Sequence, residues 1–253
     1  MVSLRAGLVG WVGPGAGRRS VLSAACALLR RMGAMLAGAL AASRLIASEG
    51  DALLARWLAM QTNVATWSAD FVQTRRLKAL TSPLEAKGRV WFEAPARFRW
   101  ELGQPARSIV LRTDADLLVL SPGLRRAERY PVAAMAAGPA GDVLALLEGG
   151  FPRDAAGFTN RFELLGSGAT NGLQWLRFRP RSEGARRLLS EFSVLLATPG
   201  MELHGTELVM RDGSTMRTDF VGARLNGPLP AGWQASPVDA TWKVTQPLGE
   251  GPR

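Results

Sequence analysis

The feature that most limits the fold of this chain is a set of strand-like segments that are apolar on both faces. A strand that shows one face to water alternates apolar and polar residues. Four segments break that alternation, at 90–92, 108–111, 117–120 and 192–196. The sheet they form must therefore be covered on both faces, either by a filled core or by a cavity that one face lines.

Most of the remaining chain has the pattern of antiparallel strands joined by short turns. Residues 97–102 alternate cleanly, with Phe98, Trp100 and Leu102 on one face, and Asp212-Gly213 is a strong hairpin signal. The pattern predicts one mainly β (α+β) domain over 48–253, built on an antiparallel sheet. The predicted strands are 68–78, 84–93, 97–102, 108–111, 117–120, 125–130, 158–165, 173–179, 188–197, 201–211 and 214–223.

One amphipathic helix is expected before the first strand. Residues 48–51, Ser-Glu-Gly-Asp, have the spacing of a capping box, and the two acids suit the positive end of the helix dipole. A stripe with a period of 3.6 residues follows and predicts a helix packed along one side. The stripe consists of Leu53, Leu54, Trp57, Leu58 and Gln61.

Two later segments depart from the strand pattern. The segment 132–147 is short, rich in alanine and interrupted by glycine and proline. This pattern predicts two short helices with a flexible joint, which would suit a lid over a cavity. Residues 226–253 hold five of the fifteen prolines. We expect an irregular tail there, with one strand near 241–244.

The first 47 residues have the composition of an export signal. They hold six arginines and no acid, and their apolar stretches at 20–29 and 32–42 follow arginine pairs. Both stretches are shorter than the roughly 20 residues that span a bilayer, so we expect cleavage near Ala41 or Ala47, with an uncleaved anchor as the alternative. The single cysteine, Cys26, lies in this segment.

The charge distribution does not favour nucleic acid as a partner. The formal net charge of the chain is +10, but residues 48–253 hold 25 basic and 21 acidic residues, which leaves +4. The arginine pairs in this part are scattered and have no aromatic residues between them.

Groups that could carry catalysis are scarce. His204 is the only histidine, and we expect it at the surface of a strand rather than in a triad or a zinc site. The glycine-rich run at 13–17 opens no βα unit, so it does not predict a phosphate loop. We therefore expect no enzyme, no cofactor and no metal; a small hydrolase that uses His204 is the remaining enzymatic alternative.

An ordered set of motifs resembles the LolA-type outer-membrane lipoprotein carriers. Residues 88–95, Gly-Arg-Val-Trp-Phe-Glu-Ala-Pro, and 98–105, Phe-Arg-Trp-Glu-Leu-Gly-Gln-Pro, keep the order and spacing of G-x-[LV]-x-[FV]-x-x-P and F-x-W-x-x-x-x-P in that family. The run Phe71-Val-Gln73 after a helix and the run Arg211-Asp-Gly-Ser-Thr215 are also similar to it. The resemblance spans about residues 50–225.

The resemblance implies a fold and a function. The fold is an incomplete, strongly curved β-barrel with an N-terminal helix and a helical lid over an apolar cavity. The function is that of a periplasmic shuttle, which takes acylated lipoproteins from an inner-membrane lipoprotein-releasing transporter to an outer-membrane acceptor. We expect a monomer. The alternative on the same fold is a periplasmic binding protein or sensor for another lipid or glycolipid.

The resemblance also implies positions for the site. The lipid-contacting aromatic of the F-x-W motif falls on Trp100, and the basic residue by which the family holds its lid closed falls on Ala94, with Arg97 or Arg99 as candidate substitutes. The expected lid residues are Met135, Leu144 and Leu147. The expected cavity residues are Phe98, Trp100, Leu102, Ile109, Leu111, Leu118 and Leu120.

Overall fold

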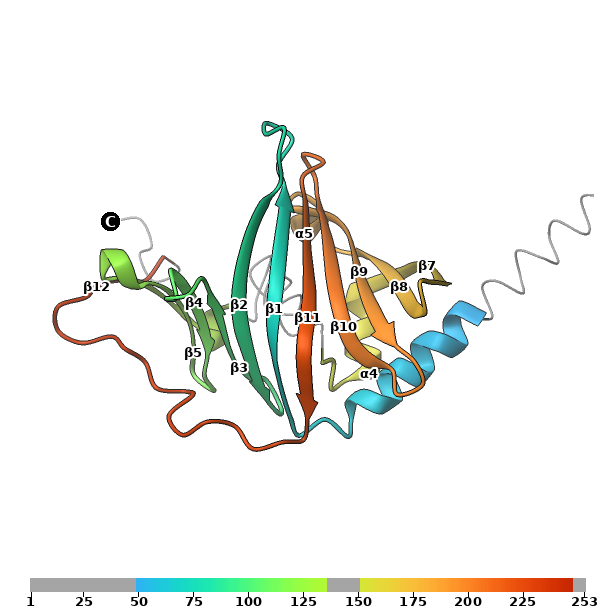
Figure 1. The fold of residues 1–253 in the computed structure, drawn as a ribbon, viewed down its shortest axis with the longest axis horizontal. Coiled ribbons are helices and arrows are strands. Elements are labelled where there is room, and N and C mark those ends of the chain that lie inside the picture. The colour runs from blue at the N-terminus through green and yellow to red at the C-terminus, as the bar shows by residue number, and fades with distance from the viewer. Residues whose placement is uncertain (1–48, 136–150, 248–253) are drawn as a thin grey trace, which may run out of the picture. The chain divides into compact units, whose positions relative to one another are not determined.

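The sheet consists of two antiparallel runs of strands. The first strand of one run pairs with the last strand of the other. The computed structural model describes residues 49–135 and 151–247. One run goes from β1 (Thr66–Arg76) to β6 (Arg126–Pro131), and the other goes from β7 (Phe162–Thr170) to β11 (Thr215–Leu225). β1 pairs with β11, and the short strand β12 (Lys243–Thr245) pairs in parallel with β6. The two runs therefore form one sheet (Figure 1).

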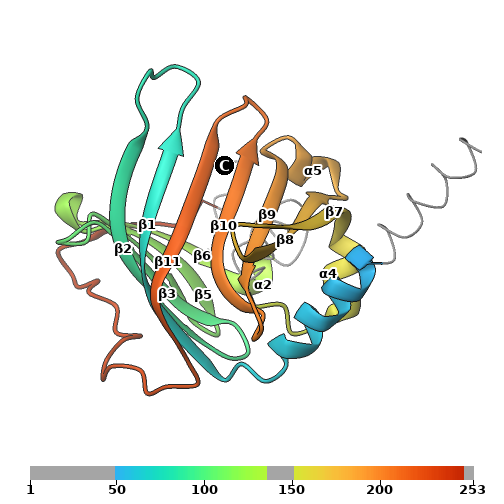
Figure 2. The same ribbon diagram turned by 45° about the vertical axis from the view of Figure 1, so that its right-hand side comes forward.

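The order of the strands is β12-β6-β5-β4-β3-β2-β1-β11-β10-β9-β8-β7. In the described residues its two ends, β12 and β7, do not pair with each other, so the curved sheet stays open (Figure 2). The predicted class, a mainly β fold with a strongly curved antiparallel sheet, is confirmed. The other elements are β2 (Leu84–Glu93), β3 (Arg97–Leu102), β4 (Ser108–Arg112), β5 (Asp116–Ser121), β8 (Leu173–Pro180), β9 (Leu189–Ala197), β10 (Glu202–Met210), η1 (Pro122–Leu124), α2 (Val132–Met135), α4 (Ala155–Arg161) and α5 (Glu183–Arg186).

A helix precedes β1 and covers the second run of strands. Its described part is residues 49–61, and the predicted stripe is buried along its full length, with Trp57 at 0% exposure. The indole of Trp57 meets the rings of Phe158 on α4 and Phe178 on β8, at centroid distances of 5.4 and 6.0 Å. One aromatic cluster thus joins the helix, α4 and β8, which lie close together in the ribbon of Figure 2. Among the described residues, no helix has the length and apolar character needed to cross a membrane.

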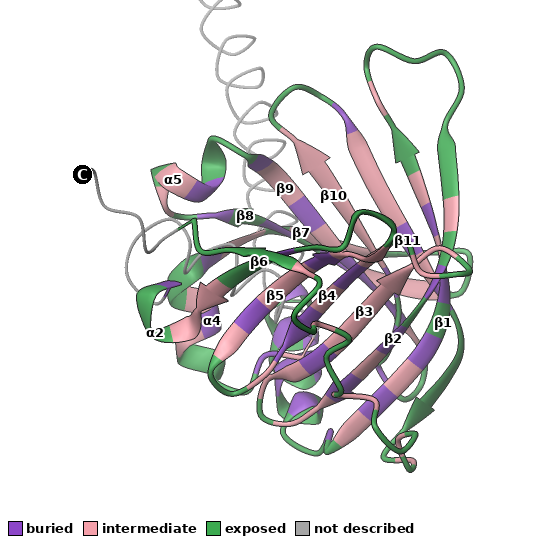
Figure 3. Cartoon of the chain, turned by 90° about the vertical axis from the view of Figure 1, so that its left-hand side faces the viewer, coloured by how far each residue is buried: buried purple, intermediate pink, exposed green. Residues whose placement is uncertain are grey.

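Strands β3, β4 and β5 are covered on both faces, as their apolar pattern predicts. None of their residues is exposed (Figure 3). On the inner face, which belongs to the main core, lie Phe98 and Leu117. On the outer face, Ile109, Leu120 and Ala127 form a second cluster, on which Val238 and Trp242 of the C-terminal segment pack.

The C-terminal segment is a structural cover rather than a loose tail. The Arg99 guanidinium donates a 2.8 Å hydrogen bond to the carbonyl of Ala235, and the Gln234 amide donates one of 3.4 Å to the carbonyl of Arg112. The expected strand near 241–244 forms as β12. The segment therefore closes the outer face of the first run.

Trp242→Ala should uncover the second apolar cluster. Because the indole is only partly buried, we expect the free energy of unfolding to fall by about 1–2 kcal/mol rather than by the larger cost of a fully buried tryptophan. Urea unfolding measures the change. Val244→Ala, on the 46% exposed side chain of β12, is the control and should change stability by less than about 0.5 kcal/mol. Equal effects of the two substitutions would contradict this role of Trp242.

One predicted strand start is wrong because a short capped helix precedes the strand. The segment 158–165 does not begin as a strand: the Asp154 carboxylate accepts a hydrogen bond from the Ala156 N–H and starts α4, so β7 begins only at Phe162. Ser182 caps α5 in the same way, and β9, which follows at Leu189, agrees with the predicted strand 188–197 to one residue. Side-chain caps of this kind stabilise a helical turn where the apolar pattern alone suggests a strand.

A candidate binding site for apolar ligands

A cavity of about 230 Å³ lies on the inner face of the sheet. It is bordered by strands of both runs, because the pairing of β1 with β11 brings their inner faces together. All of the described residues that line it are uncharged, and most are aromatic or aliphatic. They are Trp67, Gln73, Val90, Phe92, Phe98, Trp100, Val110, Phe151, Phe192, Val194, Leu203, Thr206, Leu208, Met216, Thr218 and Phe220.

An aromatic cluster forms one wall of this cavity. The Trp100 indole lies 4.2 Å from the Phe71 ring and 6.1 Å from the Phe220 ring, between centroids. Phe71 fits there because residue 88 is glycine: a Cβ at Gly88 would collide with the Phe71 ring and with the carbonyl of Glu101. The glycine of the first motif thus serves to bring an aromatic side chain close to the backbone of β2.

The polar groups of the cavity gather on β1, β10 and β11. Gln73 and Thr218 are buried, with 6% and 2% exposure, and the Gln73 amide lies 3.5 Å from the Thr218 hydroxyl. Thr206 is paired with Thr218 across β10 and β11. A mainly apolar cavity with a few converging neutral polar groups is suited to a neutral amphiphile or a hydrocarbon chain, not to an ion.

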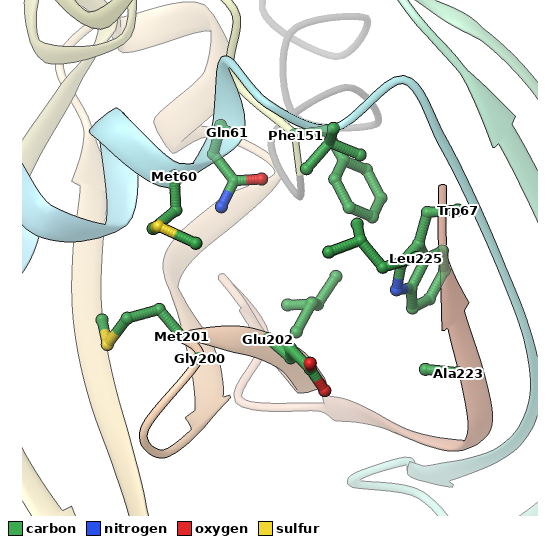
Figure 4. A pocket seen from close by; sticks show the side chains of 11 residues that line it. Met60, Gln61, Trp67, Phe151, Gly200, Met201, Glu202, Ala223 and Leu225 are labelled. Carbon is green, nitrogen blue, oxygen red and sulfur yellow. The ribbon is translucent and has the colours of Figure 1, made fainter. Parts of the chain in front are cut away.

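Two further spaces adjoin this cavity. One, of about 60 Å³, lies where the helix, the β9–β10 turn and the end of β11 meet, with Met60, Met201 and Leu225 around it (Figure 4). The other, of about 320 Å³, lies between the β2–β3 turn and α4. Phe151 lines all three spaces.

The structure brings only part of the predicted cavity set together. Phe98 and Trp100 line the cavity, and Leu102 packs against the main core beside it. Ile109, Leu118 and Leu120 belong to the outer cluster instead. Leu111 is fully buried and is paired with Leu118 across β4 and β5, on the same outer side. On β4 the residue that lines the cavity is Val110.

The reason for this difference is the period of a strand. Neighbouring residues of a strand point to opposite faces of the sheet. If the wrong face of a strand is predicted to line the cavity, every residue predicted from that strand is therefore wrong. Because 108–111 and 117–120 are apolar on both faces, their sequence does not indicate which face lines the cavity. Several lining residues were missed for this reason or because they lie on other strands, including Val110, Phe92, Phe192 and Phe220.

The predicted lid lies only partly within the described residues. Met135, at the end of α2, has 3% exposure and belongs to the main core, whereas Leu144 and Leu147 are outside the described residues. Ala94 packs against the main core.

Neither Arg97 nor Arg99 extends into the cavity. Arg97 pairs with Glu93 at 2.7 Å, and Arg99 pairs with Glu101 at 2.6 Å and binds the C-terminal segment. One buried basic residue on the inner face is Arg112. It has 7% exposure and lies beside Phe98 in the β3–β4 register.

Tyr130, at the end of β6, should titrate unusually high. Its hydroxyl donates a 2.6 Å hydrogen bond to the Glu128 carboxylate, and this bond raises the pKa of Tyr130 to about 12, with burial adding to the effect. Because the folded pKa lies above the unfolded value of about 10, the interaction stabilises the protein below pH 10, and this stabilisation is lost as the pH rises toward 12.

Absorbance at 295 nm tests this directly, since Tyr130 is the only tyrosine. In the folded protein, verified by circular dichroism, the midpoint should lie near 12, and Glu128→Gln should move it toward 10. A wild-type midpoint near 10 would contradict the assignment.

His204, the only histidine of the sequence, does not line the cavity. His204 is exposed on β10, and in the ranges 49–135 and 151–247 no three histidine, cysteine or acidic side chains gather as metal ligands would. The uncharged, largely aromatic and aliphatic lining of the cavity is suited to an apolar molecule.

An uncharged cavity on the inner face of an open, curved sheet is a site suited to apolar molecules. The sequence profile of the family "Outer membrane lipoprotein carrier protein LolA" matches residues 62–233. This match covers more than half of the chain, and the protein therefore belongs to the LolA family.

Individual proteins are similar to this chain in the same way. An outer-membrane lipoprotein carrier protein of Bordetella avium is 30% identical over 176 residues, which are 68% of this chain and 77% of that protein. One of Methylococcus capsulatus is 28% identical over 175 residues, with the same coverage of 68% and 77%. A solved LolA superfamily protein of Nitrosomonas europaea is 11% identical, covers 72% of this chain and 94% of its own, and gives a TM-score of 0.38.

Proposed function

We propose that this protein is a periplasmic carrier that holds the acyl chains of lipoproteins in its inner cavity between the inner and the outer membrane. The observation that carries the proposal is the uncharged, largely aromatic cavity in a member of the lipoprotein carrier family. The carrier is not an enzyme and needs no cofactor. Its partners are an inner-membrane transporter that releases the lipoprotein and an outer-membrane acceptor.

The physical need for such a carrier is the cost of exposing hydrocarbon to water. Each exposed methylene costs about 0.8 kcal/mol, so acyl chains do not cross an aqueous compartment unshielded. Delivery requires that the acceptor hold the chains more strongly than the carrier does. Thr206, Thr218 and Gln73 make the cavity less apolar at one side, which limits how strongly it holds hydrocarbon.

The cavity must widen to take its cargo. At about 230 Å³ it is smaller than the roughly 300–1,000 Å³ of sites that hold drug-sized ligands. The open sheet suits this requirement, because β12 and β7 are not paired with each other and can move apart without breaking ladder hydrogen bonds. A closed barrel of the same strands would lose such bonds on widening.

The proposal includes the organisation of the chain. Residues 1–47 act as the export signal, and residues 48–253 are the mature carrier, a single domain that works as a monomer. The arginine-flanked apolar stretches before residue 48 support export, and the lack of cysteine in residues 48–253 is compatible with an oxidising compartment.

Lipoprotein release from spheroplasts tests the proposal. Purified residues 48–253 are added to energised spheroplasts, and the supernatant is assayed for acylated lipoproteins. We expect a soluble one-to-one complex, and no release when spheroplasts are de-energised. Absence of lipoprotein with another lipid co-purifying instead would overturn the lipoprotein cargo and favour a binding protein or sensor for that lipid.

A further inference from the structure

Phe151 borders three neighbouring spaces of the molecule. It lines the main cavity, the small pocket around Met60 and Met201, and the space between the β2–β3 turn and α4. The main cavity and the small pocket also share Trp67 and Leu203. Only a few side chains therefore lie between the main cavity and the small pocket, whose lining is drawn in Figure 4.

The ring of Phe151 lies between two aromatic side chains of the sheet. Its centroid is 4.4 Å from that of Phe92, with the planes 21° apart, and 5.0 Å from that of Trp67. Phe92 and Trp67 pair directly across β2 and β1, so they form a fixed aromatic surface. Phe151 belongs to neither strand: it reaches this surface from the segment before α4, and it is only partly buried.

The backbone next to Phe151 is fixed in place. The Arg153 guanidinium donates hydrogen bonds of 2.5 and 2.7 Å to the carbonyls of Gln61 and Val64, where the N-terminal helix ends and its last carbonyls lack helical partners. A cation is also favoured at this end of the helix dipole. Phe151 therefore projects from a segment that is fixed two residues further on.

The pocket beyond Phe151 offers apolar side chains to the end of a hydrocarbon chain, although Gln61 and Glu202 also line it. Met60 and Leu225 are 39% and 44% exposed, although both are apolar. Methionine adapts to irregular apolar shapes more readily than other side chains. An apolar group that reached this pocket would cover these side chains and gain by doing so.

We propose that Phe151 occupies a subsite for a long acyl chain. When the ring leaves the surface formed by Trp67 and Phe92, the main cavity and the small pocket become one continuous binding volume. The chain takes the place of the ring, and its end lies among Met60, Met201 and Leu225. The inference rests on the proposed function and adds to it the path of the chain and the residue that limits chain length.

The dependence of binding affinity on the length of the acyl chain distinguishes this arrangement from a single cavity without a subsite. Each methylene that becomes buried strengthens binding about fourfold. In the wild type this gain should fall off once the chain fills the main cavity, because further methylenes must displace Phe151. In Phe151→Ala the gain should continue, since the subsite is already vacant.

The experiment is calorimetric titration of octanoate, laurate and palmitate into the protein, expressed from the full chain and purified from the periplasm. For Phe151→Ala we expect the ratio of palmitate to laurate affinity to exceed that of the wild type by about tenfold or more. Phe151→Trp, with a larger ring, should lower the ratio, which keeps the test decisive if the alanine variant does not fold. Leu124→Ala, at a 69% exposed position on η1, should leave the ratio unchanged.

The possible failures are distinguishable. If the wild type binds these fatty acids and neither Phe151 variant changes the ratio, the subsite is refuted while the proposed function stands. Weaker palmitate binding by Phe151→Ala, with laurate unaffected, would show that Phe151 is a wall of the site and would also overturn the inference. If neither the wild type nor any of the variants binds a fatty acid, the proposed function itself is refuted.

Discussion

Trp100→Glu should lower the affinity for acyl chains by about a hundredfold or more. Trp100 lines the cavity and contacts Phe71 and Phe220. The described residues that line the cavity include no cation, so a carboxylate at position 100 finds no partner of opposite charge among them. A ligand that covers this carboxylate also displaces the water that solvates it. That desolvation costs several kcal/mol, and about 2.7 kcal/mol already corresponds to a hundredfold. Titration with palmitate measures the loss.

Trp175→Glu is the matched control for this substitution. Trp175 lies on β8, outside the lining of the cavity, with the Arg177 guanidinium 5.3 Å from its ring centroid. The same change of residue should leave palmitate binding within about twofold of the wild type. Unchanged binding by a folded Trp100→Glu variant would refute the inner cavity as the binding site.

Phe178→Ala should lower the free energy of unfolding by about 3–5 kcal/mol. Phe178 has 0% exposure. Its ring is stacked on that of Phe192 at 5.1 Å and meets the edge of Phe158 at 5.2 Å. The substitution leaves a hole where the helix, α4 and β8 meet. Since domains are typically stable by only 5–15 kcal/mol, most of the stability would be lost.

Urea unfolding monitored by circular dichroism measures this effect. Leu188→Ala, at a 60% exposed position, is the control, and it should change the free energy of unfolding by less than about 0.5 kcal/mol. A loss below about 1 kcal/mol for Phe178→Ala would show that this aromatic cluster is not the main support of the helix.

The elements that could be predicted from the sequence are those with a clear local period. The stripe from Leu53 to Gln61 predicts the helix and its buried side, and the alternation at 97–102 places Phe98 and Trp100 on the inner face. The Asp212-Gly213 turn is also correct, and Gly213 has a φ of 85°. In each case the necessary information lies within a few neighbouring residues.

The choice of the inner face on β4 and β5 depends on distant residues. Ile109 and Leu120 are covered by Val238 and Trp242, which lie more than a hundred residues further along the chain. Nothing in the local pattern distinguishes Ile109 from Val110, because both are β-branched and apolar. The role of Phe151 is equally non-local, since it depends on Trp67 and Phe92 and on the anchoring of Arg153 at the end of the helix.

The most direct test of the carrier function compares one peptide with and without its acyl chains. A synthetic triacylated lipopeptide and the same peptide without acylation are each incubated with residues 48–253, and complexes are counted by native mass spectrometry. A carrier that holds acyl chains in its cavity forms a one-to-one complex with the lipopeptide alone, and Trp100→Glu abolishes that complex. Equal binding of both peptides, or binding that survives Trp100→Glu, would contradict recognition through the inner cavity.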